Sequence, residues 1–389
     1  MPTPNRLFDN IDRVYEGRRE HSERAFDYIN RSARPEYSKI RELLEVWFSR
    51  YPSKERETLK NSLRSGDRGF YSAFFELYLY NLLFQLGFEM EIHPFREGVK
   101  SRIDFRVSKG EKSLFYLEAK TILLNEQEKA LKEIENRLLD YLNNNLKSPD
   151  FFIGLKIEKQ SSHNPSFSQI CKFIQEKLDS LDYNKILIVY NEQGEENLPR
   201  WTYEHKEKEW QIMFWPVPKK PEERGIIHDR SIRVIDYDPI LINLDNKIRK
   251  AITGKSTKYG ELNLPYIVAI NILDKSEFCD KEDIERALFG ISPPHEVENY
   301  RGKLRGVWWY NGPQNRRISA VLITNNLTHC FIAQTVPLVW CNPWAERPLN
   351  FDDCTFIKLS SFKNKFEITG TINANEIFGL DPNWPNWIL

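Results

Sequence analysis

Two side chains of opposite charge, Glu118 and Lys120, lie two residues apart in an apolar segment with the composition of a strand. Because alternate strand residues point to the same face, both share one face while Leu117 and Ala119 share the other. This pairing suits phosphodiester hydrolysis. The carboxylate can hold a divalent metal that neutralises charge developing on phosphorus, and the ammonium can orient or help to deprotonate the attacking water.

A second carboxylate is needed, because a single one rarely holds Mg²⁺ in place, and Asp104 on the preceding predicted strand can supply it. The turn around Lys109-Gly110 permits two hairpin registers. Asp104 and Glu118 share a face only if the numbers of paired residues add to an even sum, because a one-residue slip turns every side chain over. Two carboxylates so close repel each other unless a cation lies between them, so the even register predicts a metal.

A third carboxylate, Glu76, is the only charged residue between Gly69 and Phe88, in a segment that is otherwise apolar enough for a buried helix. A buried carboxylate without a partner is costly, so we expect Glu76 to meet a metal, a water or a basic side chain. The purely structural alternative makes Glu118 and Lys120 a surface pair and joins Glu76 to an arginine such as Arg68.

Helices and strands that could position these residues follow from periodicity and from turn residues. The expected helices cover residues 70–86, a segment beginning at Asn125, residues 167–178 and 280–290. The expected strands cover residues 88–94, 102–107, 114–120, 151–157, 185–190, 265–271, 318–324, 330–336 and 366–370. Residues 191–233 are rich in proline, and we expect an irregular connection there with one short strand near residues 212–215.

The order helix with Glu76, strand, strand with Ile103-Asp104, strand with Glu118-Ala119-Lys120, helix, strand resembles the core of the PD-(D/E)XK, or restriction-endonuclease-like, nuclease superfamily. The resemblance covers roughly residues 70 to 190. It implies that Asp104, Glu118 and Glu76 bind Mg²⁺ or Mn²⁺, with the Ala119 carbonyl as a further ligand, and that Lys120 supports the nucleophilic water. The chain departs from the family motif at Ile103, where the family has proline.

We therefore expect an α/β fold in which a restriction-endonuclease-like mixed sheet is flanked by helices. Residues 66–235 would form this nuclease-like core. Residues 1–65 would be a helical N-terminal extension, and residues 236–389 a β-rich C-terminal module of unknown role.

The net charge is zero, with 56 basic and 56 acidic residues, which argues against binding of polyanions by bulk charge. Nucleic-acid affinity would then need a local basic patch, and the candidates are Lys247, Arg249, Lys250, Lys255 and Lys258; a solvated helix end explains this cluster equally well.

Gly254-Lys255-Ser256 is not a phosphate-binding loop, since Arg249 stands where that motif needs glycine. The aromatic run 308–310 could stack bases, but we favour a place in the core.

The five cysteines form no CxxC pair, which argues against a disulfide framework or a structural zinc site and favours reduced thiols. Residues 1–13 contain no apolar stretch and do not resemble a signal peptide. Residues 70–88 are too polar for a membrane span. These features predict a cytoplasmic protein that does not bind membranes.

The function expected from the sequence is a metal-dependent nuclease, with an endonuclease acting on DNA as the favoured form; RNA as the substrate and exonuclease action stay open. The resemblance implies in-line attack by a metal-bound water that leaves a 5′-phosphate. Restriction or antiviral defence is suggested by analogy alone. The alternative is a catalytically inactive nuclease fold that serves as a nucleic-acid-binding or protein-interaction platform. A homodimer or a regulatory partner is compatible with either function.

Overall fold

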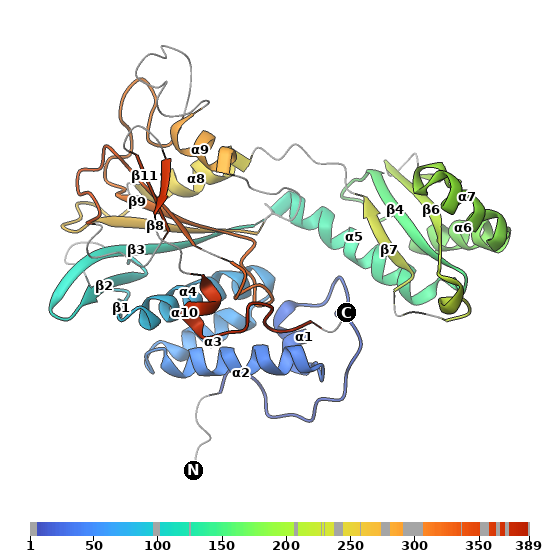
Figure 1. The fold of residues 1–389 in the computed structure, drawn as a ribbon, viewed down its shortest axis with the longest axis horizontal. Helices are drawn as coiled ribbons and strands as arrows, with labels where there is room; N and C mark the ends of the chain where they lie inside the picture. Colours follow the sequence, from blue (N-terminus) through green and yellow to red (C-terminus); the bar gives the residue numbers. More distant parts are fainter. Residues whose placement is uncertain are drawn as a thin grey trace. The chain divides into compact units, whose positions relative to one another are not determined.

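The structure is a computed structural model of mixed α/β architecture. It describes residues 6–95, 102–123, 126–205, 209–226, 228, 230–236, 244–256, 258–273, 281–290, 306–335, 337–350, 358–362, 366–369 and 373–387. The chain divides into two compact units (Figure 1). Unit 1 comprises residues 1–16, 24–123 and 242–389, and unit 2 comprises residues 17–23 and 124–241.

The first helices of unit 1 are α1 (Ala25–Arg31), α2 (Pro35–Arg50), α3 (Arg56–Arg64) and α4 (Asp67–Gln85). Apolar residues recur at helical spacing in α2, where Ile40, Leu44 and Trp47 are buried. The helical character predicted for residues 1–65 is confirmed from Ala25 onward, whereas residues 6–24 contain no helix. These residues are not a separate extension, however, because they share one hydrophobic core with α4 and the sheet.

One mixed sheet runs through unit 1 in the strand order β1-β2-β3-β8-β9-β10-β11-β12. Its strands are β1 (Glu89–Ile92), β2 (Phe105–Lys109), β3 (Lys112–Ile122), β8 (Tyr266–Ile272), β9 (Ala320–Asn325), β10 (Leu338–Cys341), β11 (Lys358–Phe362) and β12 (Phe366–Thr369). β1, β2 and β3 pair antiparallel, whereas β3, β8 and β9 pair parallel. The C-terminal strands thus extend the sheet that begins with β1 and do not form a module of their own.

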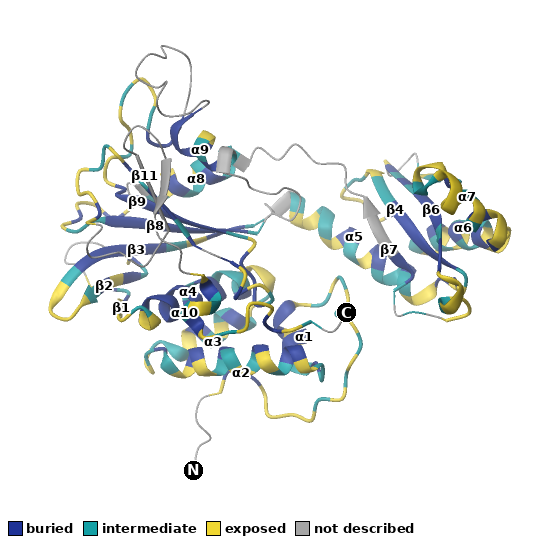
Figure 2. Ribbon diagram, viewed as in Figure 1, coloured by how far each residue is buried: buried dark blue, intermediate teal, exposed yellow. Residues whose placement is uncertain are grey.

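Helices cover both faces of this sheet (Figure 1). The α1–α4 layer and α10 (Ala374–Phe378) lie on one face, over a core that includes Phe105 and Leu117. On the other face, α8 (Leu244–Ser256) and α9 (Lys281–Phe289) pack over Tyr116, Val268 and neighbouring residues. Figure 2 shows the resulting pattern: the central strands and α4 are buried, and the outer helix faces are exposed.

The β2–β3 hairpin has the register that the chemistry requires. Phe105 pairs with Leu117 and Arg106 with Tyr116, which is the even sum and places Asp104 opposite Glu118. Nearer the turn the sum is odd, since Ser108 pairs with Ser113, and the register shifts after Val107. A bulge therefore sets the register at the open end of the hairpin.

Unit 2 is inserted in the chain between β3 and α8. Its sheet has the order β5-β6-β4-β7, formed by β5 (Trp201–His205), β6 (Trp210–Pro218), β4 (Phe151–Lys159) and β7 (Ile232–Asp236). Its helices are α5 (Glu126–Asn145), α6 (Phe167–Asp179) and α7 (Tyr183–Gln193), with short 3₁₀ turns at Glu195–Asn197 and Pro221–Glu223. These elements enclose a core of their own around Ile153, Leu155 and Ile212.

Three expectations about these elements need correction. Residues 185–190 are not a strand but part of α7, whose first turn is capped by the Asp182 carboxylate. The proline-rich segment contains β5 as well as β6. Residues 330–335 form turns, and the next strand is β10.

The expected domain boundaries also differ from the compact units. Residues 66–123 pack with residues 242–389, while residues 124–241 fold around a different sheet. The strand expected to follow the β2–β3 hairpin, β4, therefore lies in unit 2, and β8 is the parallel neighbour of β3. In the described part of the chain, no helix has the length and apolar character needed to cross a membrane.

Candidate active site

Asp104 is anchored where β2 and β3 meet at the open end of their hairpin. Its Oδ2 accepts a hydrogen bond of 2.7 Å from the backbone N–H of Ala119. His93 closes the same end from β1, because its N–H donates to the Asp104 carbonyl over 2.9 Å. The Asp104 carboxylate is thereby fixed next to the β3 residues on either side of Ala119, which are Glu118 and Lys120.

Glu118 lies in the middle of the sheet, between β2 and β8, and only 2% of its side chain is exposed. Its Oε1 accepts a hydrogen bond from Nζ of Lys255, on the last turn of α8. Nζ of Lys258 lies 3.8 Å from the same oxygen. The other oxygen, Oε2, is buried without a well-formed hydrogen bond to a described residue, and the Tyr259 hydroxyl lies close enough to interact with the Glu118 carboxylate.

Glu76 reaches this region from α4, on the opposite face of the sheet. Among the described residues it has no hydrogen-bonding or ion-pairing partner, so the predicted structural alternative of a pair with Arg68 is not what the structure contains. Burial raises the pKa of Glu76 to about 8, and the negative charges of Asp104 and Glu118 act in the same direction.

Asp104 shows the same effect. Burial and the charge of Glu118 raise its pKa to about 7, although the Ala119 N–H and the two lysines of Glu118 oppose the shift. The three carboxylates therefore act on one another electrostatically, and Glu76 and Asp104 hold protons near neutral pH when no added cation compensates them.

Lys120 is exposed and lies on the same strand face as Glu118. Partial burial of its stem and the positive charges of Lys255 and Arg68 lower its pKa, whereas Glu118 opposes this change. A lysine with a lowered pKa next to a carboxylate cluster can exchange a proton with an attacking water more readily than an ordinary lysine can.

The structure thus places Glu76, Asp104 and Lys120 within electrostatic range of Glu118, although Glu76 comes from the opposite face of the sheet. It adds Lys255 and Lys258, which sequence reasoning had placed in a nucleic-acid-binding cluster and not at the carboxylates. No local signal could have revealed this contact, because Lys255 is 137 residues away from Glu118.

The rest of the predicted nucleic-acid-binding cluster does not gather at the site. Arg249 pairs with Asp245 on its own helix, Lys250 is exposed and Lys247 is half-buried. The residues of the aromatic run 308–310 differ in exposure. Trp308 is fully buried, as expected for a core residue, whereas Tyr310 is exposed.

The residues present fit a divalent metal ion in their chemistry. Carboxylate oxygens are the ligands that Mg²⁺ and Mn²⁺ prefer, and the buried Glu118 Oε2 has no well-formed hydrogen bond. Within the described ranges, no three His, Cys, Asp or Glu side chains already stand in a metal-binding arrangement. Coordination by Glu76, Asp104 and Glu118 would therefore require their side chains to move towards a common point.

Known proteins offer no guide to this site. Comparison with models of protein families, with curated proteins and with solved structures finds no match. The function has to be inferred from the geometry of the residues themselves.

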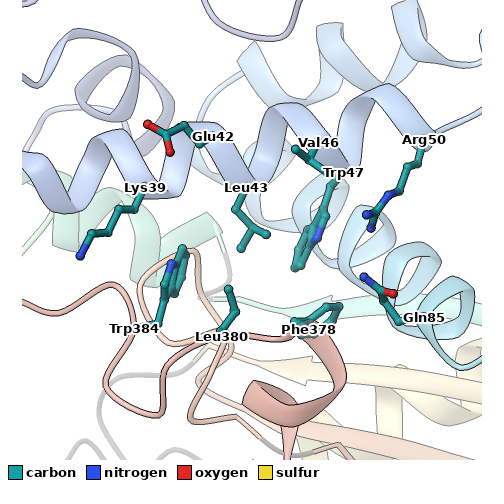
Figure 3. A pocket seen from close by; sticks show the side chains of 10 residues that line it. All are labelled: Lys39, Glu42, Leu43, Val46, Trp47, Arg50, Gln85, Phe378, Leu380 and Trp384. Carbon is teal, nitrogen blue, oxygen red and sulfur yellow. The ribbon is translucent and has the colours of Figure 1, made fainter.

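A surface pocket of about 370 Å³ lies elsewhere on unit 1 (Figure 3). Trp47 and Arg50 of α2 line one side, and Phe378, Leu380 and Trp384 of the C-terminal segment line the other. None of the four predicted catalytic residues lines it, so the pocket and the carboxylate cluster are separate features.

Proposed function

We propose that this protein is a metal-dependent nuclease whose active site consists of Glu76, Asp104, Glu118 and Lys120. The observation that carries the proposal is geometric: the hairpin register places Asp104 opposite Glu118, and Lys120 shares the strand face of Glu118. Glu76 lies within electrostatic range of both carboxylates, and burial, followed by the charges of its neighbours, raises its pKa. Three neighbouring carboxyl groups in a poorly solvated site disfavour one another's ionised forms, and such perturbed groups are typical of functional sites. A bound divalent cation would remove this repulsion.

The order of elements supports the likeness to restriction-endonuclease-like nucleases once unit 2 is set aside. Within unit 1, the chain runs through α4, β1, β2, β3, α8 and β8, with β8 parallel to β3. This is the helix–strand–strand–strand–helix–strand order of that resemblance. Helix α8 and strand β8 take the places that the sequence had suggested for α5 and β4.

In the proposed reaction, Glu76, Asp104 and Glu118 would hold Mg²⁺ or Mn²⁺, and Lys120 orients the attacking water and holds or releases its proton. The metal would supply charge neutralisation at the phosphate. Arg68 and Lys258 lie close enough to influence Lys120 and can attract the backbone of the substrate. By resemblance, we propose DNA as the substrate, endonucleolytic cleavage to a 5′-phosphate and a role in restriction or antiviral defence.

One observation favours the alternative of a catalytically inactive binding platform. Lys255 already supplies Glu118 with a positive charge from the protein itself. If this ion pair were permanent, Glu118 would need no metal, and the fold would act through its surface alone.

Cleavage assays separate the two functions. Supercoiled plasmid, single-stranded DNA and single-stranded RNA would be incubated with the wild type, Lys120→Met and Lys109→Met in Mg²⁺, Mn²⁺ or EDTA. Lys109 is a matched control at the turn of the same hairpin. We expect cleavage that requires metal, is lost in Lys120→Met and persists in Lys109→Met. Absence of cleavage of any polymer in every metal would favour the platform.

A further inference from the structure

The ion pair between Lys255 and Glu118 links the end of α8 to the middle of the central sheet. Both side chains are sheltered, with 18% of Lys255 and 2% of Glu118 exposed. The second lysine, Lys258, is farther from the carboxylate and is 42% exposed. Lys255 is therefore the main counter-charge of Glu118.

A carboxylate as deeply buried as Glu118 needs a positive charge nearby, because water cannot solvate it. In the described structure Lys255 meets this need at Oε1, and the Tyr259 hydroxyl also interacts with this carboxylate. A divalent metal bound by Glu118 would meet the same need. The ammonium and the metal cannot both lie against one carboxylate without strong repulsion.

The position of Lys255 allows its ammonium group to move away from Glu118. It is in the last turn of α8, which ends at Ser256, and its ammonium is carried on a flexible four-carbon stem. Glu76 and Asp104 have no lysine or arginine ion pair among the described residues, so Lys255, with the more distant Lys258, supplies the positive charge that a metal at Glu118 would replace.

We infer that Lys255 is the resident counter-ion of Glu118 in the metal-free protein, and that a divalent metal must displace it to bind. Lys255 therefore weakens metal binding and sets the metal concentration at which the site fills. This inference rests on the proposed metal-dependent function, and it adds a regulatory residue outside the four catalytic ones.

The test is a calorimetric titration of Mn²⁺ into the wild type, Lys255→Met, Lys255→Arg and Lys54→Met. Methionine keeps the length of the side chain without its charge, arginine keeps the charge, and Lys54 is an exposed lysine of unit 1. Removing the competing charge should tighten Mn²⁺ binding by Lys255→Met on the order of tenfold. Lys255→Arg and Lys54→Met should bind Mn²⁺ as the wild type does.

Thermal unfolding provides a second readout. In EDTA, Lys255→Met should melt at a lower temperature than Lys54→Met, because Glu118 is left buried without its partner. Saturating Mn²⁺ should raise the melting temperature of Lys255→Met by more than it raises that of the wild type.

The outcomes distinguish this inference from the proposed function. Equal or weaker Mn²⁺ binding by Lys255→Met, alongside clear binding by the wild type, would overturn the role of Lys255 and leave the nuclease proposal standing. If Lys255→Met does not fold, a Lys255→Gln variant takes its place. Tighter Mn²⁺ binding than that of the wild type then supports the role of Lys255, and equal or weaker binding overturns it. No Mn²⁺ binding by any of these proteins would overturn the metal site itself and the inference with it.

Discussion

At the scale of single residues, the main property of this molecule is a set of acidic groups that repel one another. Glu76 and Asp104 have pKa values of about 8 and 7, well above the ordinary 4.5 and 3.8, chiefly because of burial. Their protonated forms are favoured in the folded protein, so folding takes up protons over this range of pH.

The metal-free protein should therefore lose stability as the pH rises. A carboxyl with a raised pKa stabilises the fold fully below its unfolded pKa, near 4, and this contribution disappears as the pH passes through about 7 to 8. Denaturant unfolding in EDTA at pH 5, 7 and 8.5 measures this trend. Stability that increases over this range would contradict the assignment.

Glu76→Gln isolates the contribution of one carboxylate. The neutral amide cannot ionise, so the metal-free variant at pH 8.5 should be more stable than the wild type by about 2 kcal/mol. At pH 5 the two proteins should differ much less, because the wild-type carboxyl is then protonated. The same unfolding series gives both values, and a Glu76→Gln variant less stable at pH 8.5 would refute this account.

Sequence alone could single out Glu76, Asp104, Glu118 and Lys120 as candidates, because each is a charged residue in or beside an apolar element whose type could be predicted. It could not identify Lys255 as their neighbour. That contact exists because α8, which follows unit 2 in the chain, packs next to β3. The spacing of apolar residues along the sequence does not indicate such a long-range contact.

At the scale of elements, the hairpin decides whether the site exists. Its turn is compatible with either register, and the turn end in fact has the odd one. The bulge restores the even register at Phe105 and Leu117, whose side chains enter the core on the α4 face. The sequence shows that the site needs the even register, but it does not show which register forms. The register is selected by the core, which α4 and distant strands contribute.

Two substitutions of Asp104 separate its role in the hairpin from its charge. Asp104→Asn retains an oxygen that can accept from the Ala119 N–H, whereas Asp104→Ala leaves that N–H without its partner. The loss should cost Asp104→Ala about 1 to 3 kcal/mol of stability relative to Asp104→Asn. Both should lose Mn²⁺ binding. Urea unfolding and calorimetry measure the two effects, and equal stability of the variants would show that the hydrogen bond is unimportant.

Residues 185–190 show how local propensity can mislead. The run Ile186-Leu187-Ile188-Val189 has the composition of a buried strand. The chain instead forms α7, where Asp182 caps the N-terminus and Ile188 is exposed. Helix capping here overrides the strand preference of the β-branched residues.

At the scale of the whole molecule, unit 2 interrupts unit 1 between β3 and α8. Helix and strand types could be predicted on both sides of this insertion, because they depend on local periodicity. The sheet that each strand joins could not, since β4 and β8 are both apolar strands that follow a helix. This is why the predicted core extended into unit 2.

A substitution in unit 2 should leave the proposed site unaffected. A Cβ added at Gly154 would lie 2.1 Å from Cε2 of Trp215, whose Nε1 donates to Glu195. Gly154→Ala should therefore destabilise unit 2 by about 2 to 3 kcal/mol, through displacement of the indole ring. Hydrogen exchange should report faster opening in β4 and β6, while Mn²⁺ affinity stays at the wild-type value. Loss of Mn²⁺ binding would mean that the two units are not independent.

The most direct test of the central claim is the rate at which Asp104→Asn nicks supercoiled plasmid in Mg²⁺, compared with the wild type. The wild type should cleave with Mg²⁺ and not with EDTA. The folded variant should be slower by a factor on the order of 10² or more, because it lacks one charge of the metal site. Cleavage by Asp104→Asn at the wild-type rate, or wild-type cleavage that continues in EDTA, would contradict the account.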